Sequence, residues 1–302
     1  MNEHERLAER FESQRGQLGA LAYRMLGSPS EADDAVQEAW LRLSRSDPGR
    51  IENLESWLRT VVSRLCLDML RTRHSRREDP WDGQSLAQAD QDEPEHEAVL
   101  IDSVGRAMLV VLDRLTPAER IAFVLHDLFA VPFGEIAPLV DRTPAAAKKL
   151  ASRARARVRG SSPVPAGAQA HRRVVEAFLT AARDGDLEAL LAVLAPDVVR
   201  RADLAALAPG RETVVSGAVT VAREMLDFGR GARFAEPALV DGTVGAVVAP
   251  HGRLLRVLAV AVADDRVTGY EVIADPVRLR RLDVAVLPGQ AHGHRRNEGE
   301  HW

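Results

Sequence analysis

The basic side chains of this chain are concentrated in two short stretches, and their chemistry suits the phosphate backbone of a nucleic acid. Residues 64–77 hold five arginines and a single acidic residue, Asp68. Residues 142–159 hold seven basic residues and no acidic one. Because lysine and arginine neutralise phosphates and reach the edges of bases, these stretches predict two nucleic-acid-binding elements. The alternative is that both are solvated surfaces without a partner.

Acidic residues are concentrated between these two stretches. Residues 79–102 contain eight aspartates and glutamates and no lysine or arginine, so the net charge of −4 averages segments of opposite sign. High charge with few apolar residues is typical of segments that do not form a packed core. We therefore predict a flexible acidic linker over 79–102 that joins two cationic modules.

A helix before the first basic stretch is predicted to expose acidic side chains. Ser30 suits the N-cap position, which puts Asp33 and Asp34 in the first turn, where the helix dipole favours acids. The apolar residues of this helix form a single stripe, at Val36, Ala39, Trp40 and Leu43. The side chains outside that stripe form an exposed and mostly acidic patch, made of Asp33, Asp34, Gln37 and Glu38.

The first basic stretch belongs to a second helix, which follows a turn at 47–49. Apolar residues recur at helical spacing from Leu54 to Leu70 and predict a long buried face. The arginines of this helix lie on or beside its other side, at Arg59, Arg64, Arg71 and Arg73. We expect residues 5–78 to form a helical bundle.

The second basic stretch belongs to the last helix of a predicted helix-turn-helix. The run TPAE at 116–119 combines a capping box with a proline at the first helical position, and so starts one helix. A shorter helix over about 132–140, a turn at 141–142 and a basic helix over 143–159 follow. Two helices joined by a tight turn, the second strongly basic, predict a module that inserts a helix into a DNA groove.

This last helix has an apolar face and a basic face. At 100° per residue, Ala147, Leu150, Ala154 and Val158 fall on one side. The opposite side carries small and basic residues, namely Ala145, Lys148, Lys149, Ser152, Arg155 and Arg159. Small residues at the start of the helix allow a close approach to the major groove, where the basic side chains then meet phosphates and bases.

Two residues depart from the usual form of this module. Pro138 must remove a hydrogen bond from the short helix or end that helix early. Asp141 occupies a turn position at which glycine adopts a left-handed conformation more easily.

Residues after 160 are predicted to form a separate α+β unit, behind a linker over 161–170. One helix ends at Gly185, Asp186 caps the next, a strand follows, and a third helix lies near 218–228. The later stretches 243–249, 254–262 and 266–273 are predicted to be strands, the last two joined by a turn at Asp264 and Asp265. The unit is expected over 171–283, followed by a disordered polar tail over 284–302.

Composition excludes several classes of protein. A chain of 302 residues with 46% hydrophobic and 28% charged residues is typical of a globular protein of two or three domains. No apolar stretch is long enough for a membrane helix, and the polar start is unlike a signal peptide. A single cysteine, Cys66, excludes internal disulfides and cysteine-built zinc sites. We therefore expect a cytoplasmic protein without a membrane partner.

Several ordered blocks resemble the bacterial RNA polymerase sigma factors of the extracytoplasmic-function group, within the sigma-70 family. The blocks are DDAVQEAWL at 33–41, the segment from Trp57 to Arg71, LTPAER at 115–120, VPFGEIA at 131–137 and AAKKLASRAR at 146–155. The resemblance implies region 2 of a sigma factor over 5–78 and region 4, with its helix-turn-helix, over 103–160.

The resemblance also implies partners for each surface. The acidic patch would face the β′ clamp helices of core RNA polymerase, and region 4 would approach the β flap and read the −35 promoter element. The implied −35 contacts are Ala145, Lys148, Lys149, Ser152, Arg153, Arg155 and Arg159. The implied −10 contacts, with a melted strand held in a cationic groove, are Arg50, Asn53, Arg59, Arg64, Arg71 and Arg73.

The order of elements after 170 resembles the SnoaL-like, nuclear-transport-factor-2-like fold, a curved sheet wrapped on helices around a pocket. Sigma factors with this extension form the sigma-J-like subgroup, in which the extension contacts the sigma core and modulates it without a separate anti-sigma protein. The implied regulatory contacts are Trp81, Asp203, Asp275, Pro276, Arg278 and Leu279. The subgroup motifs are reduced here, because LAAL at 204–207 follows Asp203 in place of glycines.

Two other functions stay open at this point. One is a helix-turn-helix regulator whose pocket senses a small ligand. The other is a SnoaL-like isomerase or cyclase fused to DNA-binding helices, with Asp203, His251 and Asp275 as candidates for general acid/base chemistry. Since a repressor needs neither the acidic patch nor a separate basic helix, the sigma-factor interpretation leads, with no catalysis, cofactor or metal expected.

Overall fold

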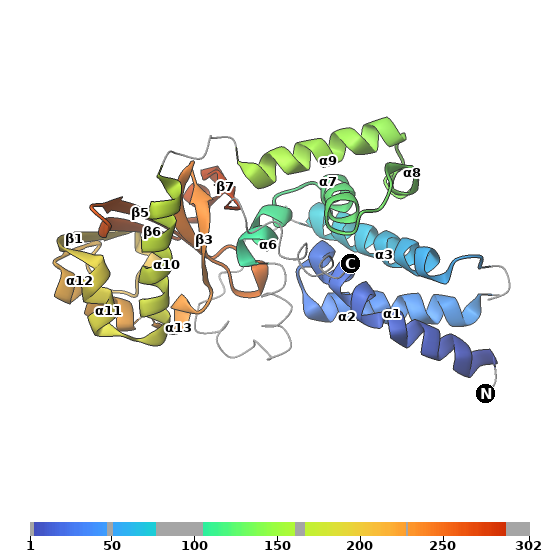
Figure 1. Cartoon of the computed structure of the whole chain (residues 1–302), viewed down its shortest axis with the longest axis horizontal. Helices are drawn as coiled ribbons and strands as arrows, with labels where there is room; N and C mark the ends of the chain where they lie inside the picture. Colours follow the sequence, from blue (N-terminus) through green and yellow to red (C-terminus); the bar gives the residue numbers. More distant parts are fainter. Residues whose placement is uncertain (1–2, 47–50, 77–104, 161–166, 228, 288–302) are drawn as a thin grey trace, which may run out of the picture. The chain divides into compact units, whose positions relative to one another are not determined.

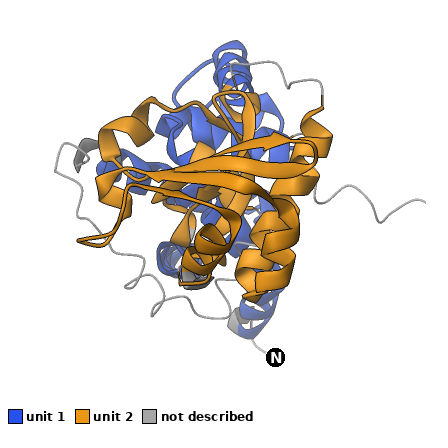
Figure 2. Cartoon of the chain, turned by 90° about the vertical axis from the view of Figure 1, so that its left-hand side faces the viewer, with its two compact units in different colours: residues 1–83, 112–156 blue, residues 84–111, 157–302 orange. Residues whose placement is uncertain are grey.

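The fold is described from a computed structural model that covers residues 3–46, 51–76, 105–160, 167–227 and 229–287. The chain divides into two compact units, shown in Figure 2. Unit 1 comprises residues 1–83 and 112–156, and unit 2 comprises residues 84–111 and 157–302. The predicted linker over 79–102 and Trp81 lie outside the described residues, as does the chain from 288 onward.

Unit 1 opens with three helices, α1 (Glu3–Leu26), α2 (Pro29–Arg45) and α3 (Leu54–Arg76), which pack on one another (Figure 1). The predicted cap of α2 is wrong by two residues. Ser28 is the N-cap, and its Oγ accepts a hydrogen bond from the Glu31 backbone N–H at 3.4 Å. Pro29 explains the shift, because its fixed φ suits the first helical position. Glu31 therefore stands in the first turn, and Asp33 and Asp34 lie beyond it.

The rest of unit 1 contains α7 (Pro117–Phe123), the π-helical turn η2 (Val124–Leu128), α8 (Phe133–Ile136) and most of α9 (Pro144–Arg159). The capping box at the start of α7 is confirmed, since Thr116 and Glu119 exchange side-chain and backbone hydrogen bonds.

The short helix of the helix-turn-helix is shorter than the predicted span of 132–140. Helix α8 ends at Ile136, and turns continue to the start of α9. Pro138 accounts for the early end, because it lacks the N–H that would continue the helical hydrogen bonds, although Ala137 before it still has helical backbone angles. Asp141 has a φ of 53°, which confirms the predicted left-handed turn.

Unit 2 is an α+β structure in which helices cover a seven-stranded sheet. Its helices are α10 (Ala168–Asp184), α11 (Leu187–Val193), α12 (Ala218–Asp227), α13 (Gly229–Ala232) and α14 (Pro276–Arg281), with short 3-10 turns η3 (Leu204–Ala206) and η4 (Pro250–Gly252). Helix α6 (Arg106–Asp113) also begins in this unit.

The strands are β1 (Leu194–Ala202), β2 (Val214–Ser216), β3 (Ala235–Val240), β4 (Thr243–Val248), β5 (Arg256–Ala263), β6 (Arg266–Ile273) and β7 (Val284–Ala285). Their order in the sheet is β2-β1-β6-β5-β4-β3-β7. Strands β1 and β6 are parallel, and the other neighbours are antiparallel. The core lies between the sheet and helices α10 to α12, around Phe178 and Phe234.

Two helical modules followed by an α+β unit confirm the predicted fold class. The β6 span and the left-handed turn at Asp264 and Asp265 are as predicted, and the Asp186 side chain caps α11. The tail was predicted to begin at 284, which is wrong, because residues 284–287 are buried and β7 pairs with β3. Three strands, β2, β3 and β7, were not predicted.

Candidate nucleic-acid interface

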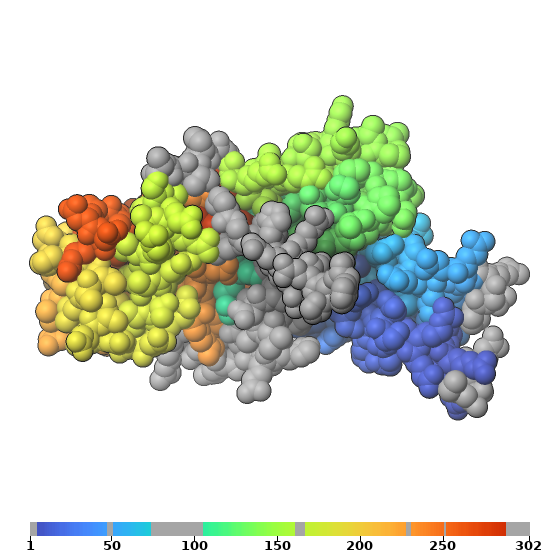
Figure 3. Space-filling model, viewed as in Figure 1, coloured from blue at the N-terminus to red at the C-terminus, as the bar shows by residue number. Residues whose placement is uncertain are grey.

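Helix α9 presents the surface best suited to DNA. Its first turn is capped by Thr143, whose Oγ1 accepts the Ala146 N–H at 3.3 Å. Ala147, Ala151 and Ala154 are fully buried, and these small side chains let α9 pack closely on the core. The helix lies at the surface in the space-filling view (Figure 3). Its exposed side chains include most of the predicted −35 contacts, namely Ala145, Lys148, Lys149, Ser152, Arg153 and Arg159.

Two arginines of α9 are tied to acidic side chains of unit 1. The Arg155 Nε donates to the Asp127 Oδ1 at 2.6 Å, and both side chains are mostly covered. Arg153 remains 65% exposed, with its Nη1 3.9 Å from an oxygen of the buried Glu119. Arg155 is therefore held by η2, whereas Lys148 and Lys149 extend into solvent.

The predicted acidic patch lies on α2, as the sequence suggested. Asp33, Asp34 and Gln37 are exposed. Glu38 is less exposed, because its Oε1 accepts a hydrogen bond from the Arg42 Nε at 2.9 Å one turn later. Ala35, Val36 and Ala39 are buried beneath these side chains, so packing of α2 on its neighbours keeps the patch outward.

Three of the predicted −10 arginines form ion pairs within unit 1. The Arg59 Nη2 lies 3.3 Å from the Glu135 Oε2, and the Arg71 Nη2 lies 3.4 Å from the Asp141 Oδ2. Both acids belong to the helix-turn-helix, Glu135 in α8 and Asp141 in its left-handed turn. Figure 1 shows α8 and α3 in the same part of unit 1.

The remaining −10 candidates differ in their surroundings. Arg73 pairs with Glu31, and its Nη1 also donates to the Leu26 carbonyl at 3.0 Å. Arg64 is exposed. Asn53 has a structural role, because its Oδ1 accepts the Ser56 N–H at 3.1 Å at the start of α3. Arg50 lies outside the described residues.

The predicted regulatory residues of unit 2 come together at the start of α14. The Asp203 carboxylate accepts backbone N–H groups of Ala206, Ala274 and Asp275 at 2.8–3.0 Å. Asp275 caps α14 by accepting the Arg278 N–H at 2.8 Å, and Pro276 takes the first helical position. These hydrogen bonds connect the end of β1, η3 and the start of α14.

The basic side chain of Arg278 lies beside these hydrogen bonds. The Arg278 Nη2 donates to the Glu271 Oε1 at 2.7 Å, and its Nη1 lies 3.9 Å from the Asp203 Oδ2. Leu279 is buried beneath it. Arg278 therefore neutralises part of the Asp203 charge.

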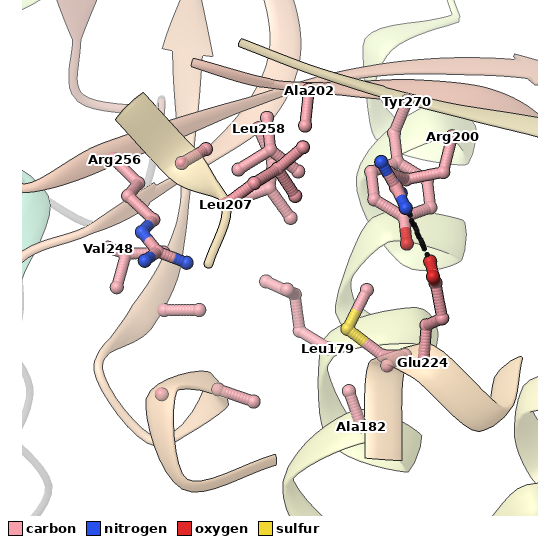
Figure 4. A pocket seen from close by; sticks show the side chains of 16 residues that line it. Leu179, Ala182, Arg200, Ala202, Leu207, Glu224, Val248, Arg256, Leu258 and Tyr270 are labelled. Atoms are coloured by element: carbon pink, nitrogen blue, oxygen red, sulfur yellow. Dashed lines mark hydrogen bonds and ion pairs between the residues drawn. The ribbon is translucent and has the colours of Figure 1, made fainter. Parts of the chain in front are cut away.

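A cavity of about 70 Å³ lies inside unit 2, between the sheet and the helices (Figure 4). Its lining is mostly apolar, with charge from Arg200, Glu224 and Arg256 and a phenol from Tyr270. Burial raises the pKa of the Tyr270 phenol, so that side chain stays neutral. None of these charged residues was singled out from the sequence. The available signal was an arginine, Arg256, at an inward position of β5 that alternates with Leu258 and Val260.

Region 2 and region 4 of sigma factors are both found by comparison with known families. "Sigma-70 region 2" matches residues 10–76, and "Sigma-70, region 4" matches residues 105–158. The chain is also 38% identical over 309 residues to the ECF RNA polymerase sigma factor SigJ of Mycobacterium tuberculosis, covering 95% of this chain and 98% of that protein. The chain belongs to the ECF RNA polymerase sigma factors.

Another relative of this sigma factor is similar over nearly the whole chain. The probable ECF RNA polymerase sigma factor SigI of Mycobacterium tuberculosis is 34% identical, covering 93% of this chain and 98% of that protein. The crystal structure of Mycobacterium tuberculosis SigJ is 35% identical and covers 90% of this chain and 98% of that chain, with a TM-score of 0.44. These relatives extend beyond region 4, as this sigma factor does.

Across the described residues of this sigma factor, no helix is both long and apolar enough to cross a membrane. The same residues place no three histidine, cysteine, aspartate or glutamate side chains together in a way that would hold a metal ion.

Region 4 is divided between the two units. Residues 105–111 and 157–158 belong to unit 2, and the rest of the region belongs to unit 1.

Proposed function

We propose that this sigma factor directs core RNA polymerase to promoters through three separate surfaces. The acidic patch on α2 contacts the β′ clamp helices, α3 with its preceding loop takes the −10 element, and α9 enters the major groove at −35. The observation that carries the −35 assignment is the exposure of Lys148 and Lys149 on a helix whose opposite face is buried alanine. The named relatives are RNA polymerase sigma factors, which supports the assignment.

Contacts within unit 1 give the proposed −35 residues different roles. Lys148 and Lys149 neutralise phosphates directly, because both side chains reach solvent. Arg155 instead positions α9 through its ion pair with Asp127. Glu135 and Asp141 form ion pairs with the guanidinium groups of Arg59 and Arg71. These ion pairs must open before the two arginines can bind the −10 element. Exposed pairs of this kind are worth about 0.2–1 kcal/mol each, which core polymerase can overcome.

We infer that unit 2 modulates initiation within the same chain by holding the two ends of region 4. At the first end, the Glu236 carboxylate accepts the Arg106 N–H at the start of α6, and the Arg106 guanidinium lies 5.6 Å from the centre of the Phe234 ring. At the second end, the Val286 N–H donates to the Val158 carbonyl at 2.9 Å. Modulation by an attached unit removes the need for a separate anti-sigma protein.

We expect no catalysis from unit 2. Asp203 and Asp275, the carboxylates considered for general acid/base chemistry, accept three and one backbone N–H groups respectively and so contribute to folding. The proposed site of action is the cytoplasm, where core RNA polymerase works.

The test is transcription in vitro with mycobacterial core polymerase and a library of genomic fragments as template. We expect the chain to produce transcripts from a defined set of start sites that share −35 and −10 elements. Transcripts no different from those of core polymerase alone would overturn the proposal.

A matched pair of variants tests the −35 surface in the same assay. Lys148→Ala with Lys149→Ala should lower output from those start sites by about tenfold and reduce the salt slope of promoter binding by roughly 2, since each phosphate contact adds about 0.9. Arg15→Ala removes an exposed arginine of α1 and should leave both unchanged. Equal effects of the two changes would contradict the assignment of α9.

A further inference from the structure

The cavity of unit 2 lies between the two layers of the fold and is partly open to solvent. Strands β1, β3, β4, β5 and β6 supply one wall, and α10, α12 and α13 supply the other. Leu179, Met225 and Leu258 contribute much of the apolar surface. Figure 4 shows that the labelled side chains converge on one open space.

One charged pair in the cavity is neutralised internally. The Arg200 Nη2 and Nε donate to the Glu224 Oε2 at 2.6 Å and 3.2 Å, and the Arg200 Nη1 donates to the Glu212 carbonyl at 2.7 Å. Glu224 also lies 3.8 Å from Arg211. Three of the five N–H donors of Arg200 are therefore used within the protein, and its positive charge is balanced by Glu224.

A second arginine, Arg256, enters the cavity from the opposite side (Figure 4). Within the described part of the chain, no side chain or carbonyl forms a hydrogen bond or ion pair with its guanidinium. Burial lowers the pKa of Arg256, and the charge of Asp203 raises it. Asp203 acts on Arg256 only from beyond ion-pair distance, because its carboxylate is turned toward three backbone N–H groups at the start of α14 and of η3.

Among the described residues, the cavity thus holds one partly buried positive charge that no close anion compensates. A guanidinium partly withdrawn from water into an apolar site is stabilised when a hydrogen-bonded anion accompanies it. Carboxylates match the planar fork of arginine and accept two parallel hydrogen bonds from it.

Volume favours a small anion. The enclosed space measures about 70 Å³, about half of the ~150 Å³ that accommodates benzene in an engineered apolar cavity. It takes a carboxylate with a short apolar part, and because the cavity is partly open to solvent, the end of a four- or five-carbon acid can lie at its mouth.

We propose that the cavity of unit 2 binds a compact organic carboxylate of about three to five carbons. The carboxylate accepts hydrogen bonds from Arg256, and its aliphatic part packs against Leu179 and Leu258. The proposal goes beyond the sigma-factor function, because it assigns a ligand class to a part of the chain that contacts neither DNA nor core polymerase in the proposed function.

The test uses the full chain and sodium butyrate as the probe, by titration calorimetry and thermal unfolding. We expect saturable binding of butyrate that raises the unfolding temperature, and at least tenfold weaker binding of the neutral butyramide. Arg256→Leu should lower butyrate affinity at least tenfold. Arg253→Leu changes an exposed arginine three residues earlier and should bind butyrate like the unmodified chain.

Several outcomes would overturn the proposal. One is the absence of binding for every carboxylate from acetate to hexanoate. Another is butyrate affinity that Arg256→Leu leaves unchanged, and a third is equal competition by inorganic phosphate or chloride, which marks a general anion site. If Arg256→Leu fails to fold, Arg256→Lys replaces it, because a lysine keeps the charge and loses the two-pronged contact; unchanged affinity there would count against arginine recognition of a carboxylate.

Discussion

A buried arginine shows how a single residue can decide the stability of unit 2. Arg200 is only 3% exposed and lies on β1 with its guanidinium bonded to Glu224 and to the Glu212 carbonyl. The next residue, Arg201, faces the other side of the sheet and is exposed. Two adjacent arginines of one strand therefore have opposite environments, because side chains alternate across a strand.

We predict that Arg200→Met destabilises unit 2 by up to about 3–5 kcal/mol, since it removes the close partner of the mostly buried Glu224 and leaves only Arg211, at 3.8 Å. The matched change Arg201→Met should cost less than about 0.5 kcal/mol. Amide hydrogen exchange in β1 and β6 measures both effects. Equal exchange in the two variants would show that the buried pair contributes nothing to stability.

Caps define where the helices of region 4 begin. Thr116 starts α7 with a reciprocal capping box, in which its Oγ1 accepts the Glu119 N–H and the Glu119 Oε2 accepts the Thr116 N–H at 3.2 Å. Thr143 starts α9 with a single side-chain bond, to the Ala146 N–H at 3.3 Å. Both helices also have proline at their first position. The two starts share their residue types and differ in the number of backbone groups they satisfy.

Thr116→Ala should therefore destabilise unit 1 more than Thr143→Ala does. Loss of an N-cap costs about 1 kcal/mol on average, and Thr116 loses a cap that also positions the buried Glu119. Urea unfolding followed by the fluorescence of Trp40 and Trp57, both in unit 1, gives the two free energies. A larger cost for Thr143→Ala would mean that the capping box adds no stability.

At the scale of the whole molecule, ion pairs within unit 1 and the attachment of region 4 to unit 2 both bear on the proposed DNA binding. Acids of the helix-turn-helix pair with arginines of α3, and unit 2 includes both the start of α6 and the end of α9. The net charge of −4 is thus the sum of oppositely charged segments, some of whose charges contact each other within unit 1. The proposed −10 binding by α3 needs these ion pairs to separate.

We predict that Glu236→Ala raises promoter output at least twofold, because α6 loses the carboxylate that accepts its first N–H. Glu188→Ala, an exposed acid in the first turn of α11, should leave output unchanged. In vitro transcription measures the promoter output. Amide hydrogen exchange in α6 reports whether the start of that helix opens when the Glu236 carboxylate is removed. Faster exchange in α6 without a change in transcription would contradict modulation by unit 2.

Local patterns in the sequence predict much of the fold and of the surface proposed to face DNA. Capping residues, prolines and apolar periodicity depend on neighbours within a few positions, so α7, α9 and α11 begin as predicted. The exposure of Lys148 and Lys149 follows from the same helical period. Local rules also explain the left-handed Asp141, whose turn is too tight for an extended residue.

Partners far apart in the sequence were decided only by the tertiary structure. The pairs Arg155–Asp127, Arg59–Glu135 and Arg200–Glu224 join residues 24 to 76 positions apart, and no local pattern encodes such distances. Strand β7 exists because β3 offers a free edge, and so residues predicted as tail are buried. Local patterns therefore specify which helices form and which faces carry charge. Tertiary packing sets which of those charges are neutralised and which, like Arg256 among the described residues, form no ion pair.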